Sequence, residues 1–390
     1  MSSLKQTGEP KKYRRQNTGS ITSRSKGSWL LRYDVFDSEG NRKQINETVR
    51  GTKTYAGEKL KRRMEAVRDG LYVNKNKGTV DHVMARFIDE YCIPPTVRLR
   101  TRHGYEGQIS RYITPVIGRV QFQGLKTARV RQIYADMLER GLSSTTVLHL
   151  HRLLKKIFNW AVEEKLLSKA NNPMATVKAP GKSEYEMEMW DIPTIHKFLD
   201  LCDQSIYGDL FTLAIHTGLR RSEICGLKWD AIDLVENRLQ VVSTLHSING
   251  HGLVSAEPKT KKSRRTVVMA PETVNLFHSI RGRQMEQGLP STGYVFTRPN
   301  GLPLIPQVVT KAFTWFIRDN GLPHLTFHGL RHAYATLGLL AGIDSKVVSE
   351  ALGHSTISIT MDLYSHVMPK MKEAHAQTIA NLLKRESQTG

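Results

Sequence analysis

The sequence predicts a multidomain α+β protein. We expect a small sheet braced by one helix, a helical bundle, and a mostly helical C-terminal domain with a small β-sheet insert. The chain has 390 residues, enough for two or three domains. Its apolar pattern changes from alternation to helical spacing after residue 78, and Pro and Gly interrupt the helical pattern near residue 173. The predicted parts are a flexible basic tail (1–16), a small β domain (17–73), a helical domain (78–172), a linker (173–187) and a C-terminal domain with a tail helix (188–390).

The charge of the chain points to a polyanionic partner. The sequence holds 57 Lys and Arg against 36 Asp and Glu, a formal net charge of +21, which favours nucleic acid or an anionic membrane surface. No apolar run is long enough to span a bilayer and no signal-peptide pattern opens the chain, so we expect a cytoplasmic protein with no membrane partner. Three scattered cysteines without a C-x-x-C pair fit a reducing compartment and argue against structural zinc: Cys92, Cys202 and Cys225.

Strand signals followed by a helix signal occupy the N-terminal region. Residues 28–36 alternate apolar and polar side chains, and residues 42–49 can return as a partner strand after a turn. Residues 55–70 have helical spacing. Because residues 1–75 hold 18 Lys and Arg against 8 Asp and Glu, a DNA-groove reader is favoured, with an ordinary β domain bearing a solvated basic face as the alternative. The candidate DNA contacts here are Lys11, Lys12, Arg14, Arg15 and Arg32.

Three apolar stripes at helical spacing predict the bundle. They run over residues 80–91, 130–138 and 147–161, and are most simply core faces. Charged residues between such stripes are usually only solvated, but in a chain this basic we expect some to face phosphate. The candidates are Lys155 and Lys156, together with Lys182 in the linker.

Chemistry-bearing residues stand in order along the C-terminal domain. The set is Arg220, Lys259, His328, Arg331, His354 and Tyr364. Two cationic arginines suit the non-bridging oxygens of a phosphodiester, because a guanidinium can hold two oxygens and stays charged. Histidine and lysine suit proton transfer, and a tyrosine nucleophile would keep the bond energy as a phosphotyrosine. No metal and no other cofactor is expected for this chemistry.

Local signals place several of these residues. Thr217-Gly218 predicts a break before a helix that carries Arg220, Glu223 and Leu227. His328 and Arg331 are three apart, so a helical turn puts them on one face. Asp344 predicts the start and Gly353 the stop of a further helix, which leaves His354 on a tight turn. Strands are predicted at 239–245 and 265–269, with Lys259 in the polar stretch between them.

Each of these residues also has an ordinary explanation. A single Arg is often a capping residue, a Lys in K-T-K-K is usually a loop charge, and a lone Tyr usually packs. His328 and His332 could bind zinc, although the H-E-x-x-H pattern and a nearby Cys are both missing. The ordered set is a stronger signal than any member of it.

With these motifs assembled, residues 190–370 resemble the catalytic domain of the tyrosine recombinases, the lambda-type integrase family. The segments that carry the resemblance are His216–Glu223, Phe327–His332, Leu352–His354 and Met361–His366. Residues 78–172 look like the core-binding domain of that family. Residues 17–73 look like its arm-site DNA-binding domain, a three-stranded sheet with one helix.

The resemblance implies a mechanism and partners. Tyr364 would attack the scissile phosphate, Arg220, Arg331 and His354 would hold its oxygens, Lys259 would protonate the 5′-oxygen, and His328 would assist as acid or base. Glu223 would orient the arginine helix from behind. The implied assembly is a homotetramer on double-stranded DNA with core and arm attachment sites. In a bacterial cytoplasm, the family often uses a small excision factor as a further partner and sometimes a host DNA-bending protein.

Other functions remain open from the sequence. A type IB topoisomerase-like enzyme shares the chemistry, but relaxation of DNA needs no second DNA address such as an arm-site domain. A DNA-binding architectural or regulatory protein would fit the charge but would not need Tyr364 in this setting. A metal-dependent nuclease would need clustered carboxylates, which are sparse near these motifs. The favoured function is site-specific integration and excision of a mobile element or prophage.

Overall fold

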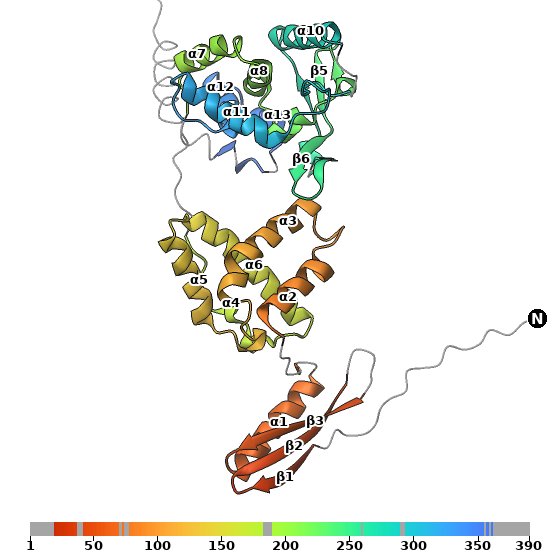
Figure 1. Cartoon of the computed structure of the whole chain (residues 1–390), viewed down its shortest axis with the longest axis vertical. Helices are drawn as coiled ribbons and strands as arrows, with labels where there is room; N and C mark the ends of the chain where they lie inside the picture. The colour runs from red at the N-terminus through yellow and green to blue at the C-terminus, as the bar shows by residue number, and fades with distance from the viewer. Residues whose placement is uncertain are drawn as a thin grey trace, which may run out of the picture. The chain divides into compact units, whose positions relative to one another are not determined.

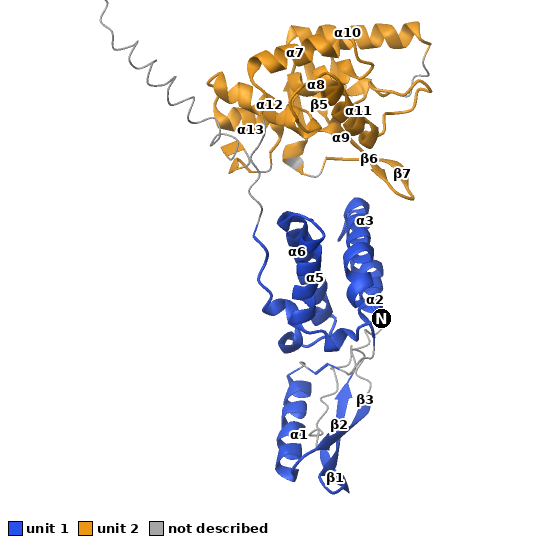
Figure 2. Cartoon of the chain, turned by 60° about the vertical axis from the view of Figure 1, so that its left-hand side comes forward, with its two compact units in different colours: residues 1–184 blue, residues 185–390 orange. Residues whose placement is uncertain are grey.

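A computed structural model describes residues 19–36, 42–69, 72–73, 78–181, 189–258, 260–288, 293–354, 356–358 and 360–361. It divides the chain into two compact units, residues 1–184 and 185–390 (Figure 2). The described residues are mostly helical with small antiparallel sheets, which confirms the predicted fold class. None of the described helices is both long enough and apolar enough to cross a membrane.

The first unit begins with an antiparallel sheet of order β1-β2-β3, covered on one face by helix α1 (Figure 1). Their bounds are β1 Ser20–Ser25, β2 Ser28–Phe36, β3 Arg42–Arg50 and α1 Lys53–Arg68. In β2, Leu31, Tyr33 and Val35 are buried while Arg32 is exposed. This period of two puts the apolar face against α1, where Leu60 joins the same core.

A helical bundle with its own apolar core makes up the rest of the first unit. Its helices are α2 Val80–Arg86, α3 Leu99–Gln108, α4 Thr114–Ile117, α5 Thr127–Glu139 and α6 Ser144–Glu163. Two π-helical turns, η1 Phe87–Tyr91 and η2 Ile109–Ile113, and three 3-10 turns, η3 Phe122–Gly124, η4 Lys169–Asn171 and η5 Pro173–Ala175, complete it. All three predicted apolar stripes contribute buried residues to this core. The first stripe ends in a π-helical turn instead of one uniform α-helix.

The second unit is mostly helical. Its helices are α7 Ile192–Cys202, α8 Gly208–Thr217, α9 Arg221–Cys225, α10 Pro271–Glu286, α11 Pro306–Asp319, α12 Phe327–Leu340 and α13 Ser345–Leu352. Short 3-10 turns lie at η6 Trp229–Ala231 and η7 Lys261–Ser263. One large core of aromatic and aliphatic residues joins α7 to α12, with Phe211 and Phe313 fully buried within it, and a smaller apolar cluster packs α13 against α12.

Two small sheets form the β insert of this unit. Strands β4 Ile232–Asp233, β5 Arg238–Val241 and β8 Arg265–Val268 form one antiparallel sheet, and β6 Thr244–Ile248 pairs with β7 Gly252–Ala256. The single strand predicted at 239–245 is therefore wrong, because the chain changes sheets between Val241 and Thr244. At this break the Ser243 hydroxyl donates to the Gly226 carbonyl oxygen at 2.6 Å.

Candidate active site

Two helices that end at glycines frame the site. Helix α8 ends at Gly218 (φ 61°) and α13 ends at Gly353 (φ 64°), both left-handed. A Cβ at Gly218 would lie 2.6 Å from a methyl of Leu352, and a Cβ at Gly353 would lie 2.8 Å from the Lys262 carbonyl oxygen. Both positions therefore favour glycine for conformation and for space. The carbonyl groups at these helix ends carry partial negative charge, which suits a guanidinium partner.

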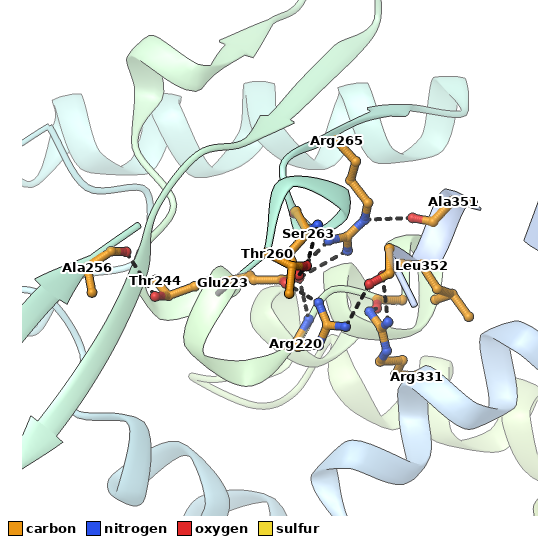
Figure 3. Close-up of polar contacts among 12 residues, drawn as sticks. Arg220, Glu223, Thr244, Ala256, Thr260, Ser263, Arg265, Arg331, Ala351 and Leu352 are labelled. Carbon is orange, nitrogen blue, oxygen red and sulfur yellow. Dashed lines mark hydrogen bonds and ion pairs between the residues drawn. The ribbon is translucent and has the colours of Figure 1, made fainter. Parts of the chain in front are cut away.

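Arg331 joins the ends of α8 and α13. It lies near the start of α12, where the Thr326 side chain caps the helix, and it is only 2% exposed. Its Nη1 donates to the Gly218 carbonyl oxygen at 2.7 Å and its Nη2 to the Leu352 carbonyl oxygen at 2.5 Å (Figure 3). Burial, followed by repulsion from Arg220, lowers the pKa of Arg331 to about 9. The guanidinium therefore remains protonated at neutral pH.

Arg220 and Glu223 are locked together at the start of α9. The backbone N–H of Arg220 donates to Glu223 Oε2 at 2.9 Å, and its Nη1 donates to Glu223 Oε1 at 2.6 Å. Its Nη2 reaches the Gly353 carbonyl oxygen at 3.0 Å. The Arg220 side chain is 31% exposed, whereas that of Glu223 is 2% exposed. Arg220 thus keeps access to solvent while a buried carboxylate fixes its direction.

The helix around Arg220 is shorter than the sequence predicted. Arg220 is the N-cap of α9, and the helix ends at Cys225, so Leu227 lies beyond it. Gly226 follows as the C-cap, and a Cβ there would lie 2.9 Å from the backbone nitrogen of Leu245. The close approach of β6 therefore leaves no room for a side chain at this position.

A third arginine, which the sequence reasoning missed, completes this cluster. Arg265 opens β8 and donates from Nε to the Ala351 carbonyl oxygen at 2.6 Å. Its Nη2 and Nη1 lie 3.0 and 3.3 Å from the two carboxylate oxygens of Glu223. Burial raises the pKa of Glu223, but the hydrogen bonds and charges of Arg265 and Arg220 outweigh it and leave the pKa lowered. The only sequence signal was a pair of arginines before a β-branched strand.

Two histidines face this cationic cluster. His354 follows Gly353 directly, is 7% exposed, and its Nδ1 lies 2.9 Å from Thr360 Oγ1. Burial lowers the pKa of His354 to about 3, and the charges of Arg331 and Arg220 act in the same direction. Desolvation by the neighbouring protein atoms lowers the pKa of His328 to about 4, and the charges of His332, Arg331 and Arg220 act in the same direction, although part of the His328 side chain reaches solvent. Both histidines are therefore neutral at pH 7.

The structure brings some predicted site residues together and leaves others undescribed. Arg220, Glu223, Arg331 and His354 converge on the Leu352–His354 turn, with His328 within electrostatic reach. The predicted site residues Lys259 and Tyr364 lie outside the described residues, as do the predicted DNA contacts Lys11, Lys12, Arg14, Arg15 and Lys182.

The remaining predicted DNA contacts lie in the first unit. Arg32 is exposed on β2, and Lys155 and Lys156 are exposed on α6. Lys156 Nζ also lies 5.5 Å from the centroid of the Tyr91 ring, a cation–π contact that still leaves much of the charge at the surface.

The charge balance of the cluster determines what it can hold. The cluster holds three guanidiniums, those of Arg220, Arg265 and Arg331, and one carboxylate, that of Glu223, which contacts Arg220 and Arg265. Within the described part of the chain, no group of three or more His, Cys, Asp or Glu side chains is arranged to hold a metal ion. The excess positive charge suits an anion with several oxygens, such as a phosphodiester.

Comparisons with known proteins agree with this geometry. Residues 187–371 match the model of the phage integrase family. The tyrosine recombinase XerC-like protein of Caldanaerobacter subterraneus subsp. tengcongensis is 31% identical over 365 residues, covering 88% of this chain and 93% of that protein. The solved integrase of transposon Tn1549, in complex with transposon right end DNA, shares the fold with a TM-score of 0.67 at 23% identity, covering 77% of this chain and 99% of that one.

A solved lambda integrase tetramer bound to a Holliday junction has a TM-score of 0.57 at 17% identity, covering 90% of this chain and 96% of that one. At this identity the likeness concerns the fold alone. Taken with the recombinase relative and the matched family, it leads to one conclusion: the chain belongs to the phage integrase family of tyrosine recombinases, enzymes that cut and rejoin DNA.

Proposed function

We propose that this recombinase cuts DNA through Tyr364. The tyrosine oxygen forms a bond to the scissile phosphorus while the bond from phosphorus to the 5′-oxygen breaks, which gives a 3′-phosphotyrosine and a free 5′-hydroxyl. The proton of the tyrosine passes to a base, for which His328 is the candidate, and Lys259 gives a proton to the leaving oxygen. The energy of the phosphodiester is conserved, so rejoining requires no ATP.

The buried arginine cluster carries this proposal. Arg220 and Arg331 neutralise charge on the non-bridging oxygens. In this proposal the Thr360 hydroxyl donates to Nδ1 of neutral His354, which leaves the Nε2–H of His354 to donate to a phosphate oxygen. Because protein acceptors already fix both guanidiniums, little reorganisation is needed when the phosphate arrives.

We propose two DNA-binding surfaces in the first unit. The exposed face of the N-terminal sheet carries Arg32, which pairs in register with Ser20 of β1 and Asn46 of β3. Arg24 and Arg50 extend the same exposed surface. This face reads arm-type DNA, and the helical bundle, with Lys155 and Lys156, contacts core-type DNA. The domain limits are residues 17–73, 78–172 and 188–390.

We propose that the protein integrates and excises a mobile element or prophage as a homotetramer, through two ordered strand exchanges and a Holliday junction. The transposon-end complex of the Tn1549 integrase and the junction-bound lambda integrase tetramer support this assignment. An excision factor and a host DNA-bending protein set direction in the bacterial cytoplasm.

A covalent-trapping experiment tests the proposed function. A labelled duplex with the core site, nicked near the cleavage point, is incubated with the protein in EDTA, with Tyr364→Phe alongside. The expected result is a denaturation-resistant adduct with the wild type only, and normal DNA binding by the variant. Relaxation of plasmids that lack the site would favour the topoisomerase alternative, and the same adduct from the variant would refute Tyr364 as the nucleophile.

A further inference from the structure

We infer that Arg265 is a positioning residue for DNA cleavage, which acts through Glu223 on Arg220 and does not touch the phosphate. This inference rests on the proposed role of Arg220 in binding the scissile phosphate. The Arg265 side chain is 6% exposed, whereas that of Arg220 is 31% exposed.

The donors of Arg265 are already used within the protein. Nε donates to the Ala351 carbonyl oxygen at 2.6 Å, Nη2 to Glu223 at 3.0 Å, and Nη1 reaches Glu223 at 3.3 Å and the Ser263 carbonyl oxygen at 3.4 Å. All three guanidinium nitrogens of Arg265 have protein acceptors, whereas the acceptors of Arg331 are bonded to its Nη1 and Nη2, so Arg265 has less left to offer a DNA oxygen. Its effect on the reaction must therefore pass through its partners.

The first partner is the carboxylate that orients Arg220. The Glu223 carboxylate accepts hydrogen bonds from both Arg220 and Arg265, so the two guanidiniums share its single negative charge. Without Arg265, the buried carboxylate would lose the partner that holds it from β8, and Arg220 would lose the fixed direction that this carboxylate gives it. Arg220 would then be less well placed for the phosphate as negative charge develops on it.

The second partner is the end of α13. The Ala351 carbonyl oxygen that Arg265 holds precedes the Leu352 and Gly353 carbonyl groups, which accept from Arg331 and Arg220. His354 follows in the same turn. One buried side chain from β8 thus contacts both the carboxylate behind Arg220 and the end of α13, whose carbonyl groups accept from Arg220 and Arg331 (Figure 3).

Arg265→Gln and Arg265→Lys test this assignment, with Arg264→Gln as the matched control. Arg264 is the adjacent arginine, is 53% exposed and pairs with the exposed Glu257. The assay is single-turnover adduct formation at saturating core-site DNA, together with the Kd for the same duplex. We expect Arg265→Gln to slow cleavage by about 10- to 100-fold with Kd within about threefold. Arg265→Lys should lie between Arg265→Gln and the wild type, and Arg264→Gln should match the wild type.

Two modified linkages identify the route of the effect. A methylphosphonate at the scissile position carries no charge and lowers the demand on Arg220, so it should shrink the Arg265→Gln defect to about threefold or less. A bridging 5′-sulfur is a better leaving group that needs no general acid, and it should leave the defect unchanged. If Arg265→Gln does not fold, the same comparison applies to Arg265→Lys.

Several outcomes would overturn the inference. One is a wild-type cleavage rate for Arg265→Gln, and another is a loss of DNA binding that parallels the loss of cleavage. A third is rescue of the variant by the 5′-sulfur linkage and not by the methylphosphonate, which would show that Arg265 acts through Lys259. Failure of the proposed function itself looks different, since the wild type would then form no adduct with any of the three linkages.

Discussion

Two buried glutamates of this chain lie between cations, one in the N-terminal sheet and one in the catalytic unit. Glu47 of β3 is 7% exposed and contacts Lys59 Nζ at 3.2 Å and Arg63 Nε at 3.1 Å, both from α1. Glu223 of α9 is 2% exposed and contacts Arg220 and Arg265. In both cases burial alone would raise the pKa of the carboxyl group, but the cationic partners outweigh burial and leave the pKa lowered. The pKa of Glu47 falls to about 2.

The two clusters differ in what surrounds the carboxylate. The cations beside Glu47 are 32% and 35% exposed, so water shares the charge and the contact mainly holds helix to sheet. In the Glu223 cluster, Arg220 is exposed to a similar degree (31%), but Arg265 is 6% exposed, and Arg331, held by main-chain carbonyls, is 2% exposed. The lowered pKa of Arg331 reflects this concentration of positive charge. The Glu47 cluster has one positive charge in excess and is open to water, whereas the Glu223 cluster has two in excess and is the more unbalanced, which favours the binding of an anion.

The largest effect should come from the arginine at the centre of the unbalanced cluster. We expect Arg331→Lys to slow single-turnover cleavage by about 10²- to 10³-fold, because a compact ammonium lacks the planar fork that reaches the Gly218 and Leu352 carbonyl oxygens at once and presents further donors to the phosphate. DNA affinity, measured by gel shift, should change by only a few-fold. A cleavage rate near that of the wild type would remove Arg331 from the proposed site.

A matched pair of substitutions tests the comparison itself. Glu223→Gln should slow cleavage by about tenfold or more, since it frees Arg220 from its fixed direction. Glu47→Gln should leave core-site cleavage unchanged and lower the stability of the N-terminal region by roughly 1–3 kcal/mol. Single-turnover cleavage and limited proteolysis measure the two effects. Slower cleavage with Glu47→Gln and normal cleavage with Glu223→Gln would show that the balance of charge does not distinguish a structural cluster from a catalytic one.

Acid should weaken the catalytic unit through His354. Its pKa in the folded protein is about 3, below the ordinary 6.5, so the unfolded chain binds more protons between these values and stability falls as the pH drops below 6.5. At pH 5 the loss amounts to about 2 kcal/mol from this residue. Thermal unfolding at pH 7 and pH 5 should therefore show a larger decrease for the wild type than for His354→Gln. Equal decreases would contradict the depressed pKa.

The smallest effect should come from the sheet face. Arg32→Ala should weaken binding to a nonspecific duplex by a few-fold and reduce the slope of log K against log salt concentration by about 0.9, as expected for one lost phosphate contact. Arg68→Ala is the control, because Arg68 lies on α1 and pairs with Asp69. Fluorescence titration at several salt concentrations measures both. Equal slopes for the two variants would argue against the sheet face as a DNA surface.

The sequence predicted the fold class because the spacing of the apolar residues and the Gly and Pro residues that end the helices were both clear. The break at Thr217-Gly218 and the stop at Gly353 are both confirmed, since each glycine has a left-handed backbone that ends a helix. Strand β1 could not be predicted from its pattern, because Ile21 is the only strongly apolar residue of the six in SITSRS. It was expected only from the family resemblance.

Contacts distant in sequence explain what was missed at the site. Arg265 meets Glu223 across 42 positions and Ala351 across 86, and no local spacing encodes either contact. The carbonyl acceptors of Gly218 and Leu352 are main-chain atoms, which residue identity does not reveal. The order of arginine, histidine and tyrosine residues along the chain predicts a chemistry. The contacts that hold these side chains in place are visible only in the three-dimensional structure.

The most direct test of the account is to identify the residue that carries the DNA. Adduct trapped on a nicked core-site duplex in EDTA can be digested with nuclease and trypsin, and the peptide that spans residues 347–370 fragmented by mass spectrometry. We predict a nucleotide on the Tyr364 side chain. A nucleotide on Ser365, or on any other residue, would contradict the proposed nucleophile and the mechanism built on it.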